Sequence, residues 1–286
     1  MSIADHSYLI IGGSPRSGTT SLFKWLSDHP SICAASIKET RFFLDADYPL
    51  QGSSRFNGDN LDDYRSFYRH CREQCGQVRL EATPDYLYTK VALQIATLLP
   101  KAKMVFVARD PVERLVSWYK YSRQRRLIDS SMSFYEYVIK QVEQESTIGT
   151  PVHMRALDQC RYDKYVPAFR QAFGERVLTI NFSDIKDDAL TTIVKLCDFI
   201  GVDGSYFGNH RFTIENASLK GRESWLGHFY SSLRRRVAYS LRRYPLTVNA
   251  MRVPNRIVKS LILKDATHAG EIIVSSEIKR IIQSNT

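Results

Sequence analysis

The sequence lacks the features of a membrane-spanning or disulfide-rich protein. It contains no run of about 18 apolar residues, so it predicts no transmembrane helix. Its first residues, MSIADHSYLIIGG, lack the charged-then-apolar order of a signal peptide. The five cysteines are odd in number and scattered, which predicts reduced, mostly buried thiols and no disulfide framework. From these features we expect a cytoplasmic protein.

Metal ligands and repeats are also scarce. Cys71 and Cys75 are one helical turn apart, but no second Cys or His pair nearby would complete a zinc site. We therefore predict no metal. The sequence contains no internal repeat and no low-complexity tract.

The positive charge is concentrated in one segment of the chain. The formal net charge is +10, and residues 220–264 carry eleven Lys or Arg and one acid, so the remaining residues balance at 29 of each sign. This pattern predicts an anionic partner near the C-terminal part. A membrane contact, an acidic glycan and a solvated helix face all remain open for this segment.

Predicted strands alternate with predicted helices along the first part of the chain. This order predicts an α/β fold with a P-loop-type, mostly parallel central sheet flanked by helices. We expect residues 1–215 to form this core, and 216–286 to form a basic helical extension packed on the same domain. Ligands of such sheets bind beyond the carboxyl ends of the strands. The predicted strands are Tyr8–Ile11, Ile32–Ala34, Gln77–Glu81, Met104–Ala108 and Arg176–Ile180. The predicted helices include Thr19–Ser27, Asp62–Cys71 and Asp187–Ile200.

The first predicted strand leads into the loop Gly13-Ser-Pro-Arg-Ser-Gly18. The two glycines have P-loop spacing, and the backbone N–H groups of such a loop bind anions together with the next helix N-terminus. A nucleoside triphosphatase would carry Lys after the second glycine. Here Thr19 and Thr20 follow it, and the cation is Arg16. The alternative is a simple strand–helix turn, but the whole succession favours an anion site.

The stretch ProArgSerGlyThrThrSerLeu resembles the 5′-phosphosulfate loop of sulfotransferases that use 3′-phosphoadenosine 5′-phosphosulfate (PAPS). The resemblance implies that PAPS is the cofactor and that no metal takes part. It also implies that Arg16 stabilises the charge that grows as sulfate leaves. The cofactor-binding residues that it implies in this loop are Arg16, Ser17, Gly18, Thr19 and Thr20.

The second motif follows the strand that ends at Ala108. Arg109 stands at the strand end, and Ser117 follows eight residues later. Sulfotransferases bind the 3′-phosphate of PAPS with an Arg and a Ser at this spacing, so the resemblance implies that role for both residues. The alternative is an Arg–Asp helix start with a surface serine.

The third motif, Ile37-Lys-Glu-Thr-Arg-Phe-Phe43, resembles the Glu-x-His-Phe-Phe stretch of glycan sulfotransferases, including the heparan sulfate type. It implies that Glu39 is the general base, with Arg41 where many relatives carry His. Lys38 is predicted to assist at the sulfate or the acceptor. The alternative is a solvated loop with the two Phe rings in the core. Tyr86 and His153 are weaker predictions for acceptor binding, as is Arg41.

The stretch Asn216-Ala-Ser-Leu-Lys-Gly-Arg222 resembles, more weakly, the family's late cofactor loop. It implies cofactor contacts for Lys220, Gly221 and Arg222, although a solvated basic loop fits as well. With no signal peptide or transmembrane helix predicted, we expect a bacterial enzyme over a Golgi one. The expected acceptor is a glycan or glycolipid. The expected reaction is sulfuryl transfer to its hydroxyl or amine, with no nucleic-acid partner and a peripheral contact of the basic segment with the inner face of an anionic membrane.

Other activities remain as alternatives. One is sulfation of a phenolic or lipid-like small metabolite. Another is a P-loop kinase, which the missing lysine disfavours. A third is a basic module that binds membrane or nucleic acid, which gives no reason for the pairing of Arg109 with Ser117.

Overall fold

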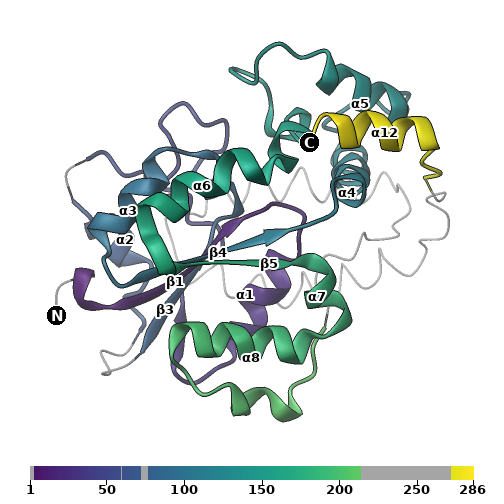
Figure 1. Ribbon diagram of the computed structural model, residues 1–286. Coiled ribbons are helices and arrows are strands. Elements are labelled where there is room, and N and C mark those ends of the chain that lie inside the picture. The colour runs from purple at the N-terminus through teal and green to yellow at the C-terminus, as the bar shows by residue number, and fades with distance from the viewer. Residues whose placement is uncertain (1–2, 59, 72–76, 214–271) are drawn as a thin grey trace, which may run out of the picture. The chain divides into compact units, whose positions relative to one another are not determined.

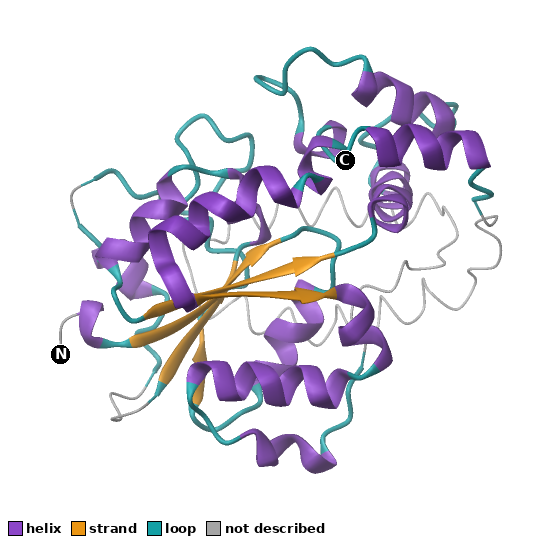
Figure 2. Cartoon of the chain, in the orientation of Figure 1, coloured by secondary structure: helices purple, strands orange, loops and turns teal. Residues whose placement is uncertain are grey.

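Five parallel strands form the central sheet of the computed structural model (Figure 2). They lie in the order β2-β3-β1-β4-β5, and most of their residues are buried, as expected for a sheet covered on both faces. The predicted α/β class with a mostly parallel sheet is confirmed. The strands are β1 (Ser7–Gly13), β2 (Ile32–Ala34), β3 (Val78–Ala82), β4 (Ala102–Ala108) and β5 (Val177–Asn181).

The structure describes residues 3–58, 60–71, 77–213 and 272–286. Met1–Asn216 and Val274–Thr286 form one unit, and Ala217–Ile273 form a second. Most of the predicted basic extension thus lies outside the described residues. Helix α12 near the C-terminus belongs to the first unit, where it contacts α4 and α5 and buries Ile278 and Ile282. Within the described ranges, no helix combines the length and the apolar character needed to cross a membrane.

Helices cover both faces of the sheet (Figure 1). On one face, residues of α1, α7 and α8 join those of the strands in one buried apolar cluster. On the other face, α6 contacts β4 and β5. The α-helices are α1 (Thr19–Ser27), α2 (Asp62–Ser66), α3 (Ile95–Leu98), α4 (Pro111–Gln124), α5 (Phe134–Val142), α6 (Tyr162–Phe173), α7 (Phe182–Asp187), α8 (Ala189–Ile200) and α12 (Ser276–Ser284). Short 3₁₀ helices span Ile3–Asp5, Pro84–Tyr88, Val91–Gln94, Val152–Met154, Asp158–Cys160, Gly174–Arg176 and Gly204–Asn209.

Local sequence explains where helix α4, which carries part of the site, begins. Asp110 is its N-cap, and the Asp110 side chain accepts a hydrogen bond from the backbone N–H of Glu113. Pro111 occupies the first helical position, where its missing N–H costs nothing. Arg109 is therefore held between the end of β4 and a capped helix start.

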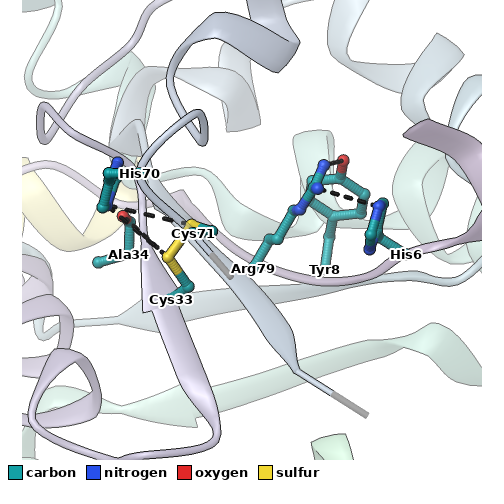
Figure 3. Close-up of a disulfide and its surroundings, with 7 residues drawn as sticks. All are labelled: His6, Tyr8, Cys33, Ala34, His70, Cys71 and Arg79. Carbon is teal, nitrogen blue, oxygen red and sulfur yellow. Dashed lines mark hydrogen bonds between the residues drawn. A yellow bond between two sulfur atoms is a disulfide. The ribbon is translucent and has the colours of Figure 1, made fainter. Parts of the chain in front are cut away.

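A disulfide joins Cys33 of β2 to Cys71, which follows α2 in the chain (Figure 3). The prediction of reduced thiols is therefore wrong for this pair. The two residues are 38 positions apart, and only the fold brings the edge strand β2 beside the segment after α2. Cys160 and Cys197 are free and buried, as predicted, and Cys75 lies outside the described residues.

Candidate active site

The loop after β1 has the backbone of an anion cradle. Gly18 has φ +79° and is the N-cap of α1. A Cβ at Gly18 would lie 3.0 Å from the Phe182 ring, so both the backbone conformation and the space favour glycine. The first N–H groups of a helix have no partner within the helix, and here they belong to Thr19 and Thr20. The loop and helix thus present N–H donors at the end of β1.

Ser14 fixes this loop to the neighbouring strand. Its Oγ donates to the carbonyl of Val107 at 2.9 Å. Because a hydroxyl has one proton, its other two contacts must be donated by the partners, Ser17 Oγ at 2.7 Å and Tyr162 OH at 3.0 Å. The Tyr162 oxygen accepts in turn from the backbone N–H of Arg109 at 3.2 Å. The loop and the end of β4 therefore share one hydrogen-bond network.

Arg16 and Ser117 meet in the structure, although 101 residues separate them. Arg16 Nε donates to Ser117 Oγ at 3.2 Å, and the guanidinium lies 4.8 Å from the ring centroid of Tyr121. The pKa of Arg16 is lowered, mainly because the side chain is buried. Arg16 remains a cation, but one that has lost part of its hydration. Such a cation gains more from a bound anion than a fully hydrated one.

Arg109 lies beside Arg16. Its Nη1 donates to the Arg16 carbonyl at 2.7 Å, and its guanidinium lies 4.3 Å from the centroid of Phe182. Its carboxylate contact is Glu113, whose Oε2 is 3.3 Å from Arg109 Nη2. The Glu113 side chain is 58% exposed, so this ion pair holds Arg109 only weakly. Burial lowers the pKa of Arg109 as well.

A pocket of about 330 Å³ opens next to Arg109. Its lining includes Tyr162, Phe182 and Lys186, none of which the sequence singled out. The position of Phe182 in the sequence could have identified it, because Phe182 directly follows β5 and so lies at the carboxyl edge where α/β sheets bind ligands. The pocket combines an aromatic face with two cations.

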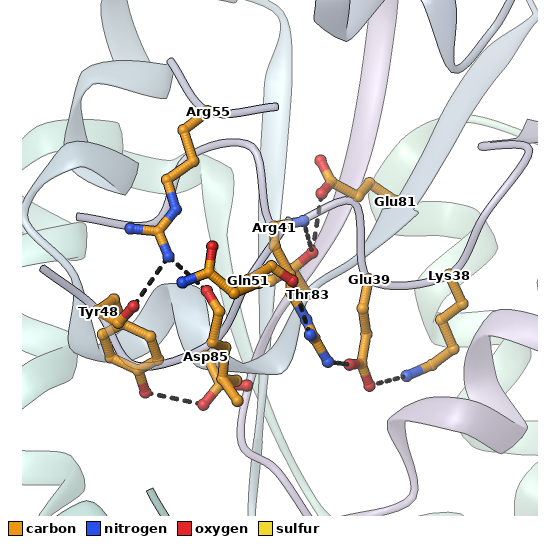
Figure 4. Close-up of polar contacts among 10 residues, drawn as sticks. Lys38, Glu39, Arg41, Tyr48, Gln51, Arg55, Glu81, Thr83 and Asp85 are labelled. Atoms are coloured by element: carbon orange, nitrogen blue, oxygen red, sulfur yellow. Dashed lines mark hydrogen bonds and ion pairs between the residues drawn. The ribbon is translucent and has the colours of Figure 1, made fainter. Parts of the chain in front are cut away.

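Glu39 lies between two cations in the loop after β2 (Figure 4). Lys38 Nζ is 3.2 Å from Glu39 Oε1, and Arg41 Nη2 is 2.7 Å from Glu39 Oε2. Burial raises the pKa of Glu39, but Lys38 and Arg41 together outweigh it and lower the pKa below its ordinary value. Glu39 is therefore a carboxylate at neutral pH.

The backbone of this loop is held against β3. Glu39 and Arg41 both have positive φ, +64° and +59°, which non-glycine residues adopt only when the surroundings enforce it. The Glu39 N–H donates to the carbonyl of Ala82 at 2.9 Å, and the Arg41 N–H donates to Thr83 Oγ1 at 3.2 Å. Glu39 thus lies at the end of β3, the strand adjacent to β1.

Glu81, which the sequence analysis did not identify, organises the residues beneath this loop. It is fully buried and accepts hydrogen bonds from four hydroxyl groups. Tyr64 OH and Tyr86 OH lie at 2.6 and 2.7 Å. Thr83 Oγ1 lies at 3.0 Å, and Thr40 Oγ1 also donates. Tyr86 has no exposed surface, so it supports this network, and the structure does not place its ring where an acceptor would stack on it.

Asp85 is a second buried carboxyl near Glu39. It accepts a hydrogen bond from Tyr48 OH at 2.8 Å (Figure 4). Burial, the largest cause, raises the pKa of Asp85 to about 6. Asp85 therefore titrates well above an ordinary aspartate.

The remaining predicted residues stand apart from this group. His153 lies in a 3₁₀ helix, and its described contacts are with Leu127 and Tyr137. Burial lowers the pKa of His153. Lys220, Gly221 and Arg222 lie outside the described residues. The structure brings together Arg16, Ser17, Arg109 and Ser117. It places Lys38, Glu39 and Arg41 at the end of β3, which is separated from β4 by β1.

Comparison with known proteins agrees with this geometry. Residues 6–219 match the family described as Sulfotransferase domain. The chain is 25% identical over 222 residues to bifunctional heparan sulfate N-deacetylase/N-sulfotransferase 4 of Mus musculus, covering 74% of this chain and 24% of that protein. It is 25% identical over 228 residues to the corresponding enzyme 3 of Homo sapiens, covering 73% and 24%. The chain thus spans about a quarter of the length of these curated relatives.

A solved structure supports the fold. The sulfotransferase from Alicyclobacillus acidocaldarius aligns with a TM-score of 0.58 and 24% identity, over 84% of this chain and 96% of that one. The family match covers well over half of the chain. This chain belongs to the sulfotransferase domain family.

Proposed function

We propose that this protein transfers a sulfuryl group from PAPS to a hydroxyl or amine of a carbohydrate acceptor. The observation that carries the proposal is the contact of Arg16 with both Ser117 and Arg109. These residues come from segments 93 and 101 positions away from Arg16, and they meet beside a pocket at the carboxyl edge of the sheet. That arrangement suits a ligand with two separate anionic groups.

In this proposal the cradle after β1 holds the 5′-phosphosulfate, and Arg16 stabilises the charge on the departing phosphate. Arg109 and Ser117 hold the 3′-phosphate, as the family resemblance implies. The Phe182 ring in the adjacent pocket offers a flat apolar face to the base. The charge of the donor is then met by guanidinium groups and N–H donors, and no step depends on a metal.

Glu39 accepts the proton of the attacking hydroxyl or amine as that group bonds to the sulfur and adenosine 3′,5′-bisphosphate leaves in line. At rest, its two ion pairs keep it ionised but make it a weak base. An acceptor that displaces Lys38 or Arg41 from the carboxylate makes Glu39 more basic at the moment of attack. The displaced cation then faces the sulfuryl group or the acceptor's own anionic groups.

A carbohydrate acceptor is favoured by the relatives, whose names identify heparan sulfate N-sulfotransferases. Lys38 and Arg41 add positive charge where an acidic glycan would bind. A phenolic or lipid-like metabolite is the alternative acceptor. Membrane contact of residues 220–264 stays a prediction from charge alone. The cytoplasmic location also stays a prediction, and the Cys33–Cys71 disulfide removes one of its supports.

Calorimetric titration with adenosine 3′,5′-bisphosphate in EDTA tests the cofactor site. We expect micromolar binding by the wild type and a roughly 10–100-fold loss in Arg109→Ala, the size of a charge-assisted hydrogen bond. Arg170→Ala, which removes an exposed arginine on α6 outside the pocket lining, is the matched control and should bind as wild type. If the folded wild type does not bind, or binds only ATP with magnesium, the proposal is wrong and the kinase alternative replaces it.

A further inference from the structure

The sulfur atoms of Cys33 and Cys71 have a histidine beside them (Figure 3). His70 Nε2 lies 3.7 Å from Cys33 Sγ and 4.0 Å from Cys71 Sγ. The three atoms all lie within 4.8 Å of one another. None of these residues belongs to the candidate active site. Cys33 is buried, Cys71 is partly buried and His70 is exposed, so the cluster has an open side.

The separations between these atoms match a tetrahedral metal site. Zinc binds cysteine sulfur at about 2.3 Å and histidine nitrogen at about 2.0–2.1 Å, which places tetrahedral ligand atoms about 3.5–3.8 Å apart. Both sulfur–nitrogen distances are already close to that range. Only the two sulfur atoms must separate, and reduction of their bond allows this. The exposed side leaves room for water as a fourth ligand.

We propose that the reduced protein binds one zinc ion through Cys33 Sγ, Cys71 Sγ and His70 Nε2. A dithiol reductant supplies two electrons and two protons to the disulfide and becomes a disulfide itself. The two thiols then release their protons to solvent as zinc binds both thiolates. The site thus alternates between a disulfide when oxidised and a zinc cross-link when reduced.

Both states cross-link the same two parts of the fold. Cys33 lies in the edge strand β2, which leads directly into the Lys38–Arg41 loop. Cys71 lies in the segment after α2, and that segment already bonds to the chain after β2, because the Ser36 N–H donates to the Phe67 carbonyl at 2.9 Å. Zinc in the reduced protein therefore preserves a link that reduction would otherwise remove. The zinc site is independent of the proposed reaction.

The test titrates ZnCl₂ into the full chain, reduced with a phosphine and freed of metal, in competition with a chromophoric chelator. We expect one zinc per reduced wild-type chain and none in the oxidised chain, whose free thiols are counted in parallel. His70→Ala and Cys71→Ser should each bind at least tenfold more weakly. Cys75→Ser and His153→Ala are the matched controls and should bind as wild type. Cobalt in place of zinc should give a thiolate charge-transfer band that Cys71→Ser reduces.

Two results would overturn the proposal. One is a folded, reduced wild type that binds no stoichiometric zinc, in which case the cluster is a disulfide only. The other is equal affinity in wild type, His70→Ala and Cys71→Ser, or loss of zinc in Cys75→Ser, since either places the ion elsewhere. His70 is exposed, so its variant should fold, and it decides the question even if a cysteine variant unfolds.

Discussion

Replacing Glu39 by Gln tests the catalytic assignment most directly. The change keeps the size of the side chain and removes its charge and its basicity. A positioned general base contributes roughly 10²–10⁴-fold to the rate. We therefore expect kcat to fall by two to four orders of magnitude, while the affinity for adenosine 3′,5′-bisphosphate stays within about threefold of wild type, less than the effect of one ordinary hydrogen bond. Cofactor affinity is spared because Glu39 is absent from the described contacts of Arg16 and Arg109.

The cost to folding should be small and can be worked out from the ion pairs. The Glu39 side chain is 33% exposed, and its partners Lys38 and Arg41 are 18% and 28% exposed. Partly exposed pairs of this kind contribute at most about 1 kcal/mol each. Because Gln can still accept hydrogen bonds from both cations, we expect a loss of about 1 kcal/mol in total, or about 2–4 °C in Tm.

The assay follows transfer of labelled sulfate from PAPS to N-deacetylated heparosan, with phenol and sugar acceptors in parallel. Glu143→Gln, an exposed glutamate at the end of α5, is the matched control and should retain full activity. Because the pKa of Glu39 is lowered in the free protein, the wild-type kcat/KM, which reports the free enzyme, should not decline on the acid side until pH falls below the ordinary glutamate pKa of about 4.3. A folded Glu39→Gln protein with wild-type kcat, or one that no longer binds the bisphosphate, would refute the reasoning.

Four further substitutions test the structure around the site. Asp85 has a folded-state pKa of about 6, so the unfolding free energy of the wild type should fall as pH rises from about 4 to 6. Asp85→Asn should remove this loss, worth up to about 3 kcal/mol, so denaturant unfolding should show the variant gaining stability relative to wild type between about pH 4 and pH 7.5; an equal difference from wild type at these two pH values would contradict it. Arg114→Met should cost about 3–5 kcal/mol in the same assay, because the fully buried guanidinium bonds to the carbonyls of Pro15 and Ala156; a change under about 1 kcal/mol would be inconsistent with that role. Gly18 and Gly201 share a φ near +80°, so replacing either by Ala should lower the free energy of unfolding by about 1–2 kcal/mol. Only Gly18→Ala should weaken bisphosphate binding, because only its methyl group meets Phe182, and equal binding by both variants would count against the anion cradle.

Much of the fold follows from local sequence. The predicted strand Ile32–Ala34 and helix Thr19–Ser27 have the observed bounds, because apolar runs and the glycine loop define them. The predicted helix Asp62–Cys71 is wrong in length, since α2 ends at Ser66. The helix predicted over Asp187–Ile200 is confirmed as α8, which ends at Ile200 but begins two residues later, because Asp188 is its N-cap and Asp187 is the last residue of α7. Helix ends depend on caps and tertiary contacts that apolar periodicity does not record.

The candidate site also contains residues that the sequence predicts and residues that it does not. Arg16, Arg109, Ser117 and Glu39 stand in motifs that follow strands, so topology alone places them at one edge of the sheet. Arg114 and Glu81 were not predicted, because their hydrogen-bond partners are scattered along the chain. Arg114 reaches carbonyls 99 and 42 positions away, and Glu81 reaches hydroxyls up to 41 positions away. Buried charges of this kind are recognised only when their hydrogen-bond partners are seen.

The predicted acceptor side and the predicted donor side of the site differ in how their charges are balanced. Glu39 is flanked by Lys38 and Arg41, so on the predicted acceptor side both cations are already paired with a carboxylate while the site is empty. The described partners of Arg16 are a hydroxyl and an aromatic ring, and neither cancels its charge. Among the described residues, Arg109 has one carboxylate partner, and that partner is largely exposed. In the proposed reaction, the strongly anionic donor therefore meets partly desolvated cations whose charge is little compensated, whereas the acceptor must first break an ion pair. This difference in electrostatic balance fits a protein that holds the donor tightly and activates its base only when the acceptor arrives.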